Sequence, residues 1–251
     1  MIEIDHVSKT YDRTKAVDDL TLTVKQGEFF AFLGSNGAGK TTTIKLVAGL
    51  LRPDAGRIRV GGIDVEKDYL AAKSIMAYVP DQPYLYDKLS GREFLRFMGG
   101  LFGMERNGLA GEIDHVSEQF NLREFVDDLT ETYSHGMKQR LTLAATLLHH
   151  PKVVVVDEPL VGLDPQSARL VKNILKEETR TGTTIFMSTH VLSIAEETAD
   201  RIGIIRRGKL VAVGTLAEVR TAWGGEGSLE DIFLRIVAEE TDGRVPGATM
   251  G

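Results

Sequence analysis

The stretch that decides the fold runs from Phe29 to Thr42 and reads FFAFLGSNGAGKTT. The apolar run at 29–33 predicts a buried strand, because a short apolar run that ends in a glycine loop is typical of one. Residues 34–41, GSNGAGKT, match the pattern G-x-x-x-x-G-K-[ST], and a helix is expected from about residue 40 to 51. A strand before the match and a helix after it are the context in which such a loop binds phosphate.

The expected role of this loop follows from its backbone. Glycines let the N–H groups surround phosphate oxygens, and the helix start adds its positive dipole. Lys40 is expected to reach the β- and γ-phosphates, the Thr41 hydroxyl to hold Mg²⁺, and Thr42 to face the α-phosphate. A chance glycine-rich turn is the alternative, expected in on the order of one chain in a hundred of this length. The nucleotide-binding residues of the loop are predicted to be Ser35, Asn36, Gly37, Ala38, Gly39, Lys40, Thr41 and Thr42.

A second apolar run, VVVVDEP at 153–159, ends in two acids. The carboxyl ends of the strands in a parallel sheet form the ligand crevice. There Asp157 is expected to bind Mg²⁺ through its water, and Glu158 to orient an attacking water as general base. The alternative is that one of these acids caps the next turn.

The segment YSHGMKQR at 133–140 predicts a second helix start that suits an anion. Ser134 is a good N-cap, Gly136 leaves the first turn bare, and Lys138 and Arg140 add positive charge. The alternative is an ordinary capped helix without a ligand.

Strand and helix patterns alternate at both ends of the chain and predict a parallel sheet in the core. Residues 90–150 are predicted to contain three or four helices and no strand, as an inserted subdomain. The segment 224–227 is expected to be a hinge, Ser228 to cap an amphipathic helix, and the tail 241–251 to be disordered. Beyond 29–33, strands are expected at 2–7, 21–24, 57–60, 76–79, 153–156, 183–187, 201–206 and 209–213, and helices at 166–180, from about 191, and at 215–223.

Composition limits the classes of function. The chain has 251 residues, a net charge of −6 and no cysteine, so disulfides and thiolate metal sites are excluded. The negative charge argues against a general nucleic-acid binder. The N-terminus has no signal-peptide pattern and no segment approaches 18 apolar residues, so a membrane role is expected only through a partner.

Five segments together resemble a known family. GSNGAGKT, YSHGMKQR, VVVVDEP, GLD at 162–164 and STH at 188–190 occur in the order and spacing of an ABC-type ATPase, over roughly residues 1–235. The resemblance implies an α/β P-loop NTPase fold with a mixed-sheet core, an N-terminal antiparallel β subdomain and an inserted helical subdomain. The implied divisions are an ATPase domain at 1–225 (core 1–80 and 151–225, helical subdomain 81–150) and a C-terminal helix at 226–240.

Site residues also follow from the resemblance. ABC ATPases work as head-to-tail dimers, so Ser134 and Gly136 are expected to contact the γ-phosphate bound to the opposite chain. Tyr11 is expected to stack on adenine and Val17 to contact the ribose side. Asp164 matches the loop that signals between the two sites. His190 matches the histidine that contacts the γ-phosphate and helps to hold the catalytic water.

Three positions depart from the family pattern. His135 stands where the family commonly has glycine, and Met137 where it commonly has glutamine. In YVPDQP at 78–83, Asp81 occupies the usual glutamine position and Gln82 follows. Either Asp81 or Gln82 could reach Mg²⁺ and the water.

The resemblance predicts the ATP-hydrolysing motor of a membrane transporter that uses ATP and Mg²⁺. The expected partners are a separate membrane-spanning permease and a second ATPase subunit, identical or related, with no nucleic acid. SLEDIFLRI at 228–236 resembles the ending of ATPases that pair with ABC-2-type export permeases, which favours export from the cytoplasmic face of the membrane. The alternative is a soluble assembly ATPase, such as those of iron–sulfur cluster biogenesis.

Overall fold

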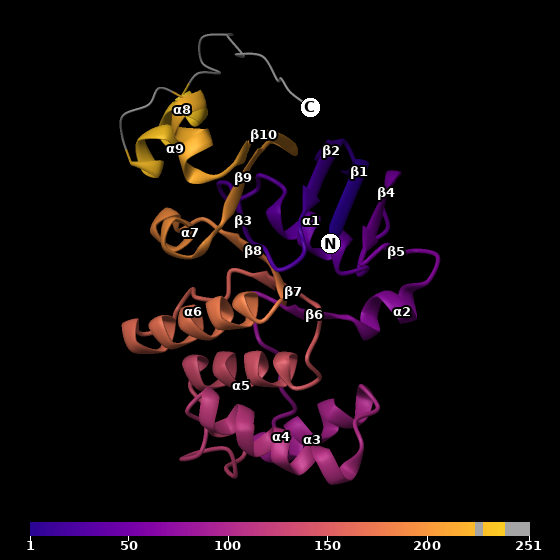
Figure 1. The fold of residues 1–251 in the computed structure, drawn as a ribbon, viewed down its shortest axis with the longest axis vertical. Helices are drawn as coiled ribbons and strands as arrows, with labels where there is room; N and C mark the ends of the chain where they lie inside the picture. The colour runs from indigo at the N-terminus through magenta and orange to yellow at the C-terminus, as the bar shows by residue number, and fades with distance from the viewer. Residues whose placement is uncertain (224–227, 239–251) are drawn as a thin grey trace.

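The computed structural model describes residues 1–223 and 228–238. The hinge expected at 224–227 and the tail expected at 241–251 lie outside these residues. Two sheets form the upper part of the molecule and a block of helices forms the lower part (Figure 1). None of the helices in the described part of the chain has the length and apolarity that a membrane crossing requires.

The larger sheet positions the site. Its strand order is β10-β9-β3-β8-β7-β6, and β9, β3, β8, β7 and β6 run parallel while β10 is antiparallel to β9. This is the mixed sheet that the sequence predicts. The strands are β3 (Phe29–Leu33), β6 (Met76–Val79), β7 (Val153–Asp157), β8 (Thr184–Thr189), β9 (Arg201–Arg206) and β10 (Lys209–Gly214).

Strand β3 shows why its sequence is apolar at every position. Phe29, Ala31 and Leu33 pack into one hydrophobic cluster, and Phe30 and Phe32 pack into the other. Successive side chains of a strand point to opposite faces, so the sheet is covered on both faces. A continuous apolar run is the consequence.

The smaller sheet is antiparallel, with the order β2-β1-β4-β5. It comprises β1 (Ile2–Tyr11), β2 (Thr14–Val24), β4 (Ala55–Val60) and β5 (Ile63–Asp64). Strands β1 and β2 are longer than the sequence predicted, and β5 was not predicted. The pairing of β1 with β2 contains register shifts, and His6 and Asp19 have positive φ. These bulges break the alternation on which the prediction rested.

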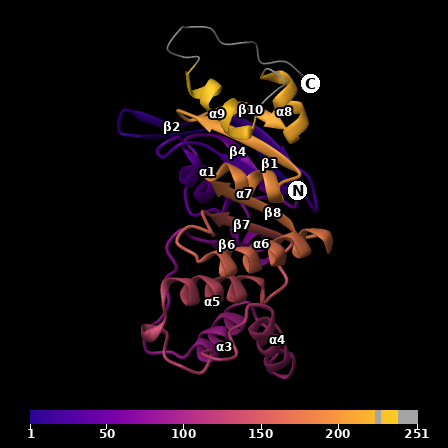
Figure 2. The same cartoon turned by 90° about the vertical axis from the view of Figure 1, so that its left-hand side faces the viewer.

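The helical block lies below the larger sheet in both views (Figures 1 and 2). It contains α3 (Gly91–Leu101), α4 (Arg106–Gln119), the short 3₁₀ helix η1 (Thr130–Thr132) and α5 (His135–Leu147). α6 (Pro165–Arg180) lies beside α5, and the two helices contact strands β8 and β6 of the larger sheet, respectively. The described residues 90–150 contain these four helical segments and an isolated bridge between Ser90 and Leu129 but no strand, which agrees with the prediction. The domain limits at 80 and 150 stay a prediction.

The remaining helices differ in how well they were predicted. α1 (Lys40–Val47) is shorter than expected, because Gly49 with φ +65° follows its C-cap Ala48 and ends the helix. α2 (Tyr69–Ser74) was not predicted. α7 (Leu192–Thr198), α8 (Leu216–Ala222) and α9 (Leu229–Ala238) agree closely with expectation. Ser228 caps α9, since its hydroxyl accepts a hydrogen bond from the Asp231 N–H at 3.2 Å.

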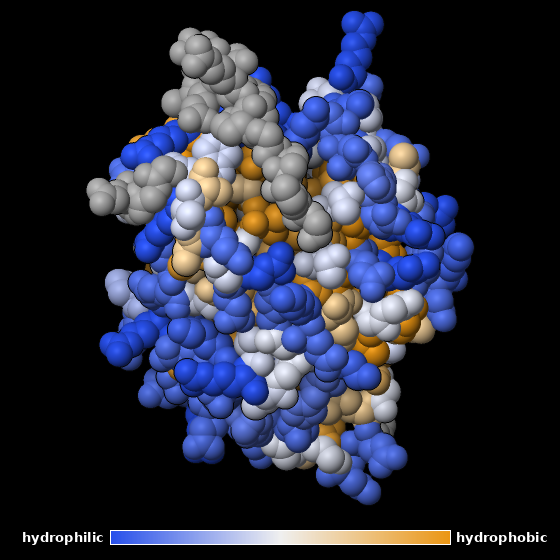
Figure 3. Space-filling view, turned by 45° about the horizontal axis from the view of Figure 1, so that its top comes forward, coloured by the Kyte–Doolittle hydropathy of each residue, from blue (hydrophilic) through white to orange (hydrophobic). Residues whose placement is uncertain are grey.

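Hydrophilic residues dominate the face in Figure 3, with hydrophobic ones gathered toward its middle.

Candidate active site

The loop between β3 and α1 has the geometry of an anion cradle. Gly39 is the N-cap of α1 with φ 112°, no side chain caps the helix, and its first turn has no acid. A Cβ on Gly39 would lie 2.3 Å from the Ala16 carbonyl oxygen, so both the conformation and the space require glycine. The bare N–H groups of this helix start therefore remain available to a phosphate.

Lys40 follows this glycine and is almost fully buried. Its ammonium donates a hydrogen bond to the Gly34 carbonyl at 2.7 Å and lies 3.5 Å from Glu158 Oε1. The positive charge of Lys40 thus lies between the start of the loop and the end of β7.

The two acids at the end of β7 have different surroundings. Asp157 is fully buried, and its Oδ1 accepts a hydrogen bond from the Ser188 hydroxyl. Its Oδ2 is buried without a hydrogen-bond partner among the described residues. Glu158 is 14% exposed, and its Oε1 lies 2.9 Å from His190 Nδ1. Asp157 is therefore suited to bind a cation, and Glu158 to act on a group in the adjoining space.

Lys40 and Glu158 line a cleft of about 820 Å³, a volume in the range of ligand sites, whereas the buried Asp157 is not among the lining residues. Eleven predicted site residues line it: Ser35, Asn36, Gly37, Gly39, Lys40, Thr41, Thr42, Asp81, Gln82, Glu158 and His190. Four further residues line it that the sequence did not indicate as ligands: Ala16, His135, Val161 and Gly162. The segments that were predicted to act together from distant parts of the sequence thus meet in one cleft.

Three predicted nucleotide contacts lie elsewhere. Val17 is fully buried in the core of the smaller sheet, so its side chain does not reach the cleft, and the neighbouring Ala16 lines it instead. Ala38 is also buried. Tyr11 ends β1 with 45% of its surface exposed, and the Lys9 ammonium lies 6.0 Å from its ring centroid. Its stacking on adenine stays a prediction.

The loop after β6 carries both candidates for the glutamine role. Asp81 Oδ1 accepts a hydrogen bond from the Gln82 N–H at 2.9 Å, and both side chains line the cleft. Burial raises the pKa of Tyr78 to about 12, and the charges of Asp157 and Asp81 add to this effect. Asp81 therefore contributes negative charge on the side of the cleft where Asp157 lies.

The second helix start lies beside the loop that follows Glu158. Ser134 is the N-cap of α5, as predicted, and its hydroxyl accepts from the Met137 N–H at 3.3 Å. His135 Nε2 lies 3.3 Å from the Val161 carbonyl oxygen. Ser134 is exposed, and Gly136 is partly exposed, and neither lines the cleft of its own chain.

The guanidinium of Arg140 bonds carbonyl oxygens of its own chain. Its guanidinium donates to the carbonyl oxygens of Phe120 and Asn121 at 3.3 and 3.0 Å, and its carbon Cζ lies 5.1 Å from the Phe125 ring centroid. Burial lowers the pKa of Arg140. Arg140 thus satisfies the carbonyls at the end of α4 and joins α4 to α5, whereas the sequence suggested a phosphate contact.

Asp164 caps α6, because its Oδ1 accepts from the Gln166 and Ser167 N–H groups at 3.0 Å each. Hydrogen bonds from Ser167 lower the pKa of Asp164.

Ser188 is the main residue that sequence reasoning missed. It stands in the STH segment, where only the histidine suggested a role.

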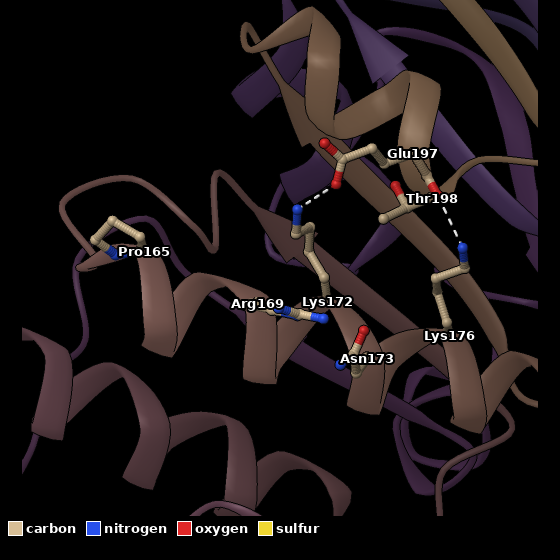
Figure 4. A pocket seen from close by; sticks show the side chains of 7 residues that line it. All are labelled: Pro165, Arg169, Lys172, Asn173, Lys176, Glu197 and Thr198. Carbon is tan, nitrogen blue, oxygen red and sulfur yellow. Dashed lines mark hydrogen bonds and ion pairs between the residues drawn. The ribbon is translucent and has the colours of Figure 1, made fainter.

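A second hollow, of about 370 Å³, lies between α6 and α7 (Figure 4). Arg169, Lys172 and Lys176 face it from α6. Two of the three cations are engaged across it, Lys172 with the Glu197 carboxylate and Lys176 with the Glu197 carbonyl oxygen at 2.8 Å. These contacts make the hollow a junction between the two helices.

Comparison with known proteins agrees with this geometry. The family model described as ABC transporter matches residues 17–161. The linearmycin resistance ATP-binding protein LnrL of Bacillus subtilis (strain 168) is 36% identical, over 90% of this chain and 73% of LnrL. The daunorubicin resistance ATP-binding protein DrrA3 of Streptomyces coeruleorubidus is also 36% identical, over 93% of this chain and 73% of DrrA3.

Solved structures show the same fold. The ATP-binding subunit of an ABC transporter superposes with a TM-score of 0.89 at 30% identity, covering 94% of this chain and 99% of that chain. A dimeric ATP-binding cassette with ADP and Pi superposes with a TM-score of 0.80 at 23% identity, covering 86% and 99%, and supports the fold alone. With the phosphate loop, Glu158 and His190 lining one cleft and Asp157 buried next to Glu158, the chain belongs to the family of ABC transporter ATP-binding proteins.

Proposed function

We propose that this ABC ATPase is the motor subunit of a drug-type exporter and drives a separate membrane-spanning permease from the cytoplasmic face. The observation that carries the proposal is the cleft in which Lys40, Glu158 and His190 meet at the ends of three adjacent strands. The direction of transport rests on the relatives, which are resistance and bacitracin transport proteins by name. These names also argue against a soluble assembly ATPase.

The donor set fits Mg²⁺. The carboxylate oxygen Asp157 Oδ2 is buried without a partner among the described residues, and hydroxyl and carboxylate oxygens are the ligands that Mg²⁺ prefers. No group of three or more histidine, aspartate or glutamate side chains in residues 1–223 and 228–238 could hold a metal alone. Thr41, Asp157 and one of Asp81 or Gln82 would therefore hold Mg²⁺ together with phosphate oxygens and water.

Hydrolysis follows from the placement of the charged groups. Glu158 would accept a proton from the attacking water, and His190, 2.9 Å from its carboxylate, would keep that water and carboxylate aligned. Lys40 and the bare helix start stabilise negative charge on the transferring phosphoryl group. Bound Mg²⁺ would supply further charge neutralisation between the phosphates.

A second ATPase subunit would complete the site. The exposed Ser134 and the partly exposed Gly136 do not line the cleft of their own chain, so they are free to contact ATP held by a partner subunit. In a head-to-tail dimer, Ser134 and Gly136 would donate hydrogen bonds to the γ-phosphate on the opposite chain. Loss of the γ-phosphate by hydrolysis would then remove these contacts and open the dimer.

An exposed aromatic cluster favours the helical block as the permease contact. Tyr84 and Tyr86, 79% and 47% exposed, follow directly after the Asp81–Gln82 loop. Tyr86 packs edge-on against Tyr84 and Phe97, with ring centroids 6.0 and 5.3 Å apart. Aromatic side chains of this kind are enriched at protein interfaces. The cluster therefore links the nucleotide cleft to the surface where we place the permease.

The test is to purify the tagged Glu158→Gln variant from detergent-solubilised native membranes with ATP and Mg²⁺. A stoichiometric multi-span protein should co-purify. Co-purification should be lost when Tyr84→Ala and Tyr86→Ala are added to this variant. It should be kept in the control Tyr69→Ala, which removes an exposed tyrosine from α2. Soluble partners alone, with the protein absent from the membrane fraction, would contradict the proposal.

A further inference from the structure

Ser188 lies fully buried near the end of β8, directly opposite Asp157 in the parallel pairing of β7 and β8. Its hydroxyl donates to Asp157 Oδ1. The same hydroxyl oxygen accepts from the Glu158 N–H at 3.2 Å, and the Ser188 carbonyl also accepts from that N–H at 3.2 Å. One serine therefore contacts both acids of the site.

For Asp157 this contact decides which oxygen is available. A buried carboxylate needs hydrogen bonds to offset its lost hydration. The Ser188 hydroxyl engages Oδ1, and Oδ2 has no hydrogen-bond partner among the described residues. The serine thereby fixes the carboxylate orientation and leaves one defined oxygen for a cation.

For Glu158 the contact holds an unusual backbone. Its φ of +50° lies in the left-handed region, which a non-glycine residue keeps only where its surroundings fix it. Both acceptors of the Glu158 N–H in the described part of the chain belong to Ser188. From this backbone the side chain reaches His190 Nδ1 at 2.9 Å and Lys40 Nζ at 3.5 Å.

We propose that Ser188 is a positioning residue that orients Asp157 toward the metal and holds the backbone of Glu158 in its catalytic geometry. This inference rests on the proposed roles of Asp157 as Mg²⁺ ligand and of Glu158 as base. Loss of such an outer partner typically costs 10–100-fold in metal affinity or activity.

The same strand offers a matched control. Thr184 is also fully buried in β8, and its hydroxyl oxygen accepts from the Gly27 N–H at 3.0 Å. It contacts no acid of the site. Thr184→Val thus deletes a buried, hydrogen-bonded hydroxyl from β8 at the end far from Asp157, and it separates general destabilisation of the strand from an effect on the acids.

The first measurement is the affinity of Mn²⁺ for the ADP complex, by electron paramagnetic resonance, which needs no turnover. Ser188→Ala should weaken it about 10-fold or more. Ser188→Cys, which keeps a weak donor of similar size, should weaken it less, and Thr184→Val should leave it unchanged. If Ser188→Ala unfolds, the cysteine variant carries the test, and wild-type affinity in it would overturn the inference.

The second measurement is kcat at saturating Mn²⁺. Because metal occupancy is then restored, a remaining loss of about 10-fold in Ser188→Ala with little change in KM reports the displaced Glu158. Restoration of the wild-type kcat would refute the part of the inference that concerns Glu158.

Asp157→Asn separates the two proposals. Wild-type Mn²⁺ affinity in Asp157→Asn would sink the proposed metal role itself. A large loss in Asp157→Asn with none in Ser188→Ala, or equal losses in Ser188→Ala and Thr184→Val, would sink only the role of Ser188.

Discussion

Acidification should destabilise the helical block through His149, which follows α5. Its imidazole stacks on Phe102 with ring centroids 3.5 Å apart, and both ring nitrogens are buried without a hydrogen-bond partner among the described residues. Burial lowers the pKa of His149 from its ordinary 6.5 to about 4, and the neighbouring His150 adds to this effect. Protonation of the His149 imidazole therefore destabilises the folded state.

The magnitude follows from that pKa difference. One pKa unit corresponds to about 1.4 kcal/mol, so the full difference corresponds to roughly 3 kcal/mol. The imidazole is partly exposed, and solvent screening reduces this to on the order of 1–2 kcal/mol. As the pH falls, the imidazole of His149 is protonated in the unfolded chain before it is protonated in the folded chain. The resulting destabilisation of the folded state is therefore absent above pH 6.5 and grows as the pH falls toward 4.

The assay compares urea unfolding of the parent and His149→Phe between pH 7.5 and pH 4.5. The phenylalanine keeps a ring against Phe102 and removes the titrating group. Between pH 7.5 and pH 4.5, the unfolding free energy of the variant should therefore rise by about 1–2 kcal/mol relative to that of the parent. His115→Gln, which removes an exposed imidazole from α4, should run parallel to the parent. A difference between parent and His149→Phe that stays constant with pH would refute the reasoning.

Three further changes test the cleft. Glu158→Gln should bind ATP with parental affinity in a fluorescent-nucleotide titration and lose about 10²–10³-fold in kcat, equivalent to ~3–4 kcal/mol; turnover at the parental rate would exclude Glu158 as the base. Gly39→Ala should abolish nucleotide binding in the same titration, since its Cβ would meet the Ala16 carbonyl at 2.3 Å, whereas Gly108→Ala in open space should not. Ser134→Ala should lower kcat at least 10-fold and leave ATP binding to the monomer intact. Equal losses in kcat and in the affinity of the monomer for ATP would contradict a role of Ser134 across the dimer.

The sequence predicted those parts of the site that are encoded locally. The phosphate loop, the acids at the end of β7 and the capped start of α5 each depend on neighbouring residues, and the structure has each of these segments where it was predicted. Val17, expected from the resemblance to contact the ribose side, is fully buried and does not line the cleft, because the bulged pairing of β1 with β2 decides which side of β2 is buried. Arg140 depends on where α4 ends, which lies about twenty residues away in sequence.

Ser188 could not be predicted for a different reason. A buried serine in an apolar strand has no pattern of its own, and its partners are determined only by the register that places it opposite Asp157. Asp81 and Gln82 show the same limit, because both side chains line the cleft and adjacent residues can exchange roles there. Pairing across strands, rather than spacing along the chain, carries this information.

The strand order explains why these residues act together. β8 comes after β3 and β7 in sequence, yet it lies between them in the sheet. Ser188 and His190, at its end, therefore lie between the ends of β3 and β7, and each contacts an acid directly. α7 follows His190 at once, and Glu196 on α7 accepts from Arg220 on α8 and from the Leu229 N–H at 2.9 and 3.1 Å. A shift of β8 relative to β7 would therefore disturb the Asp157 carboxylate, the Glu158 backbone and the His190 contact in one movement.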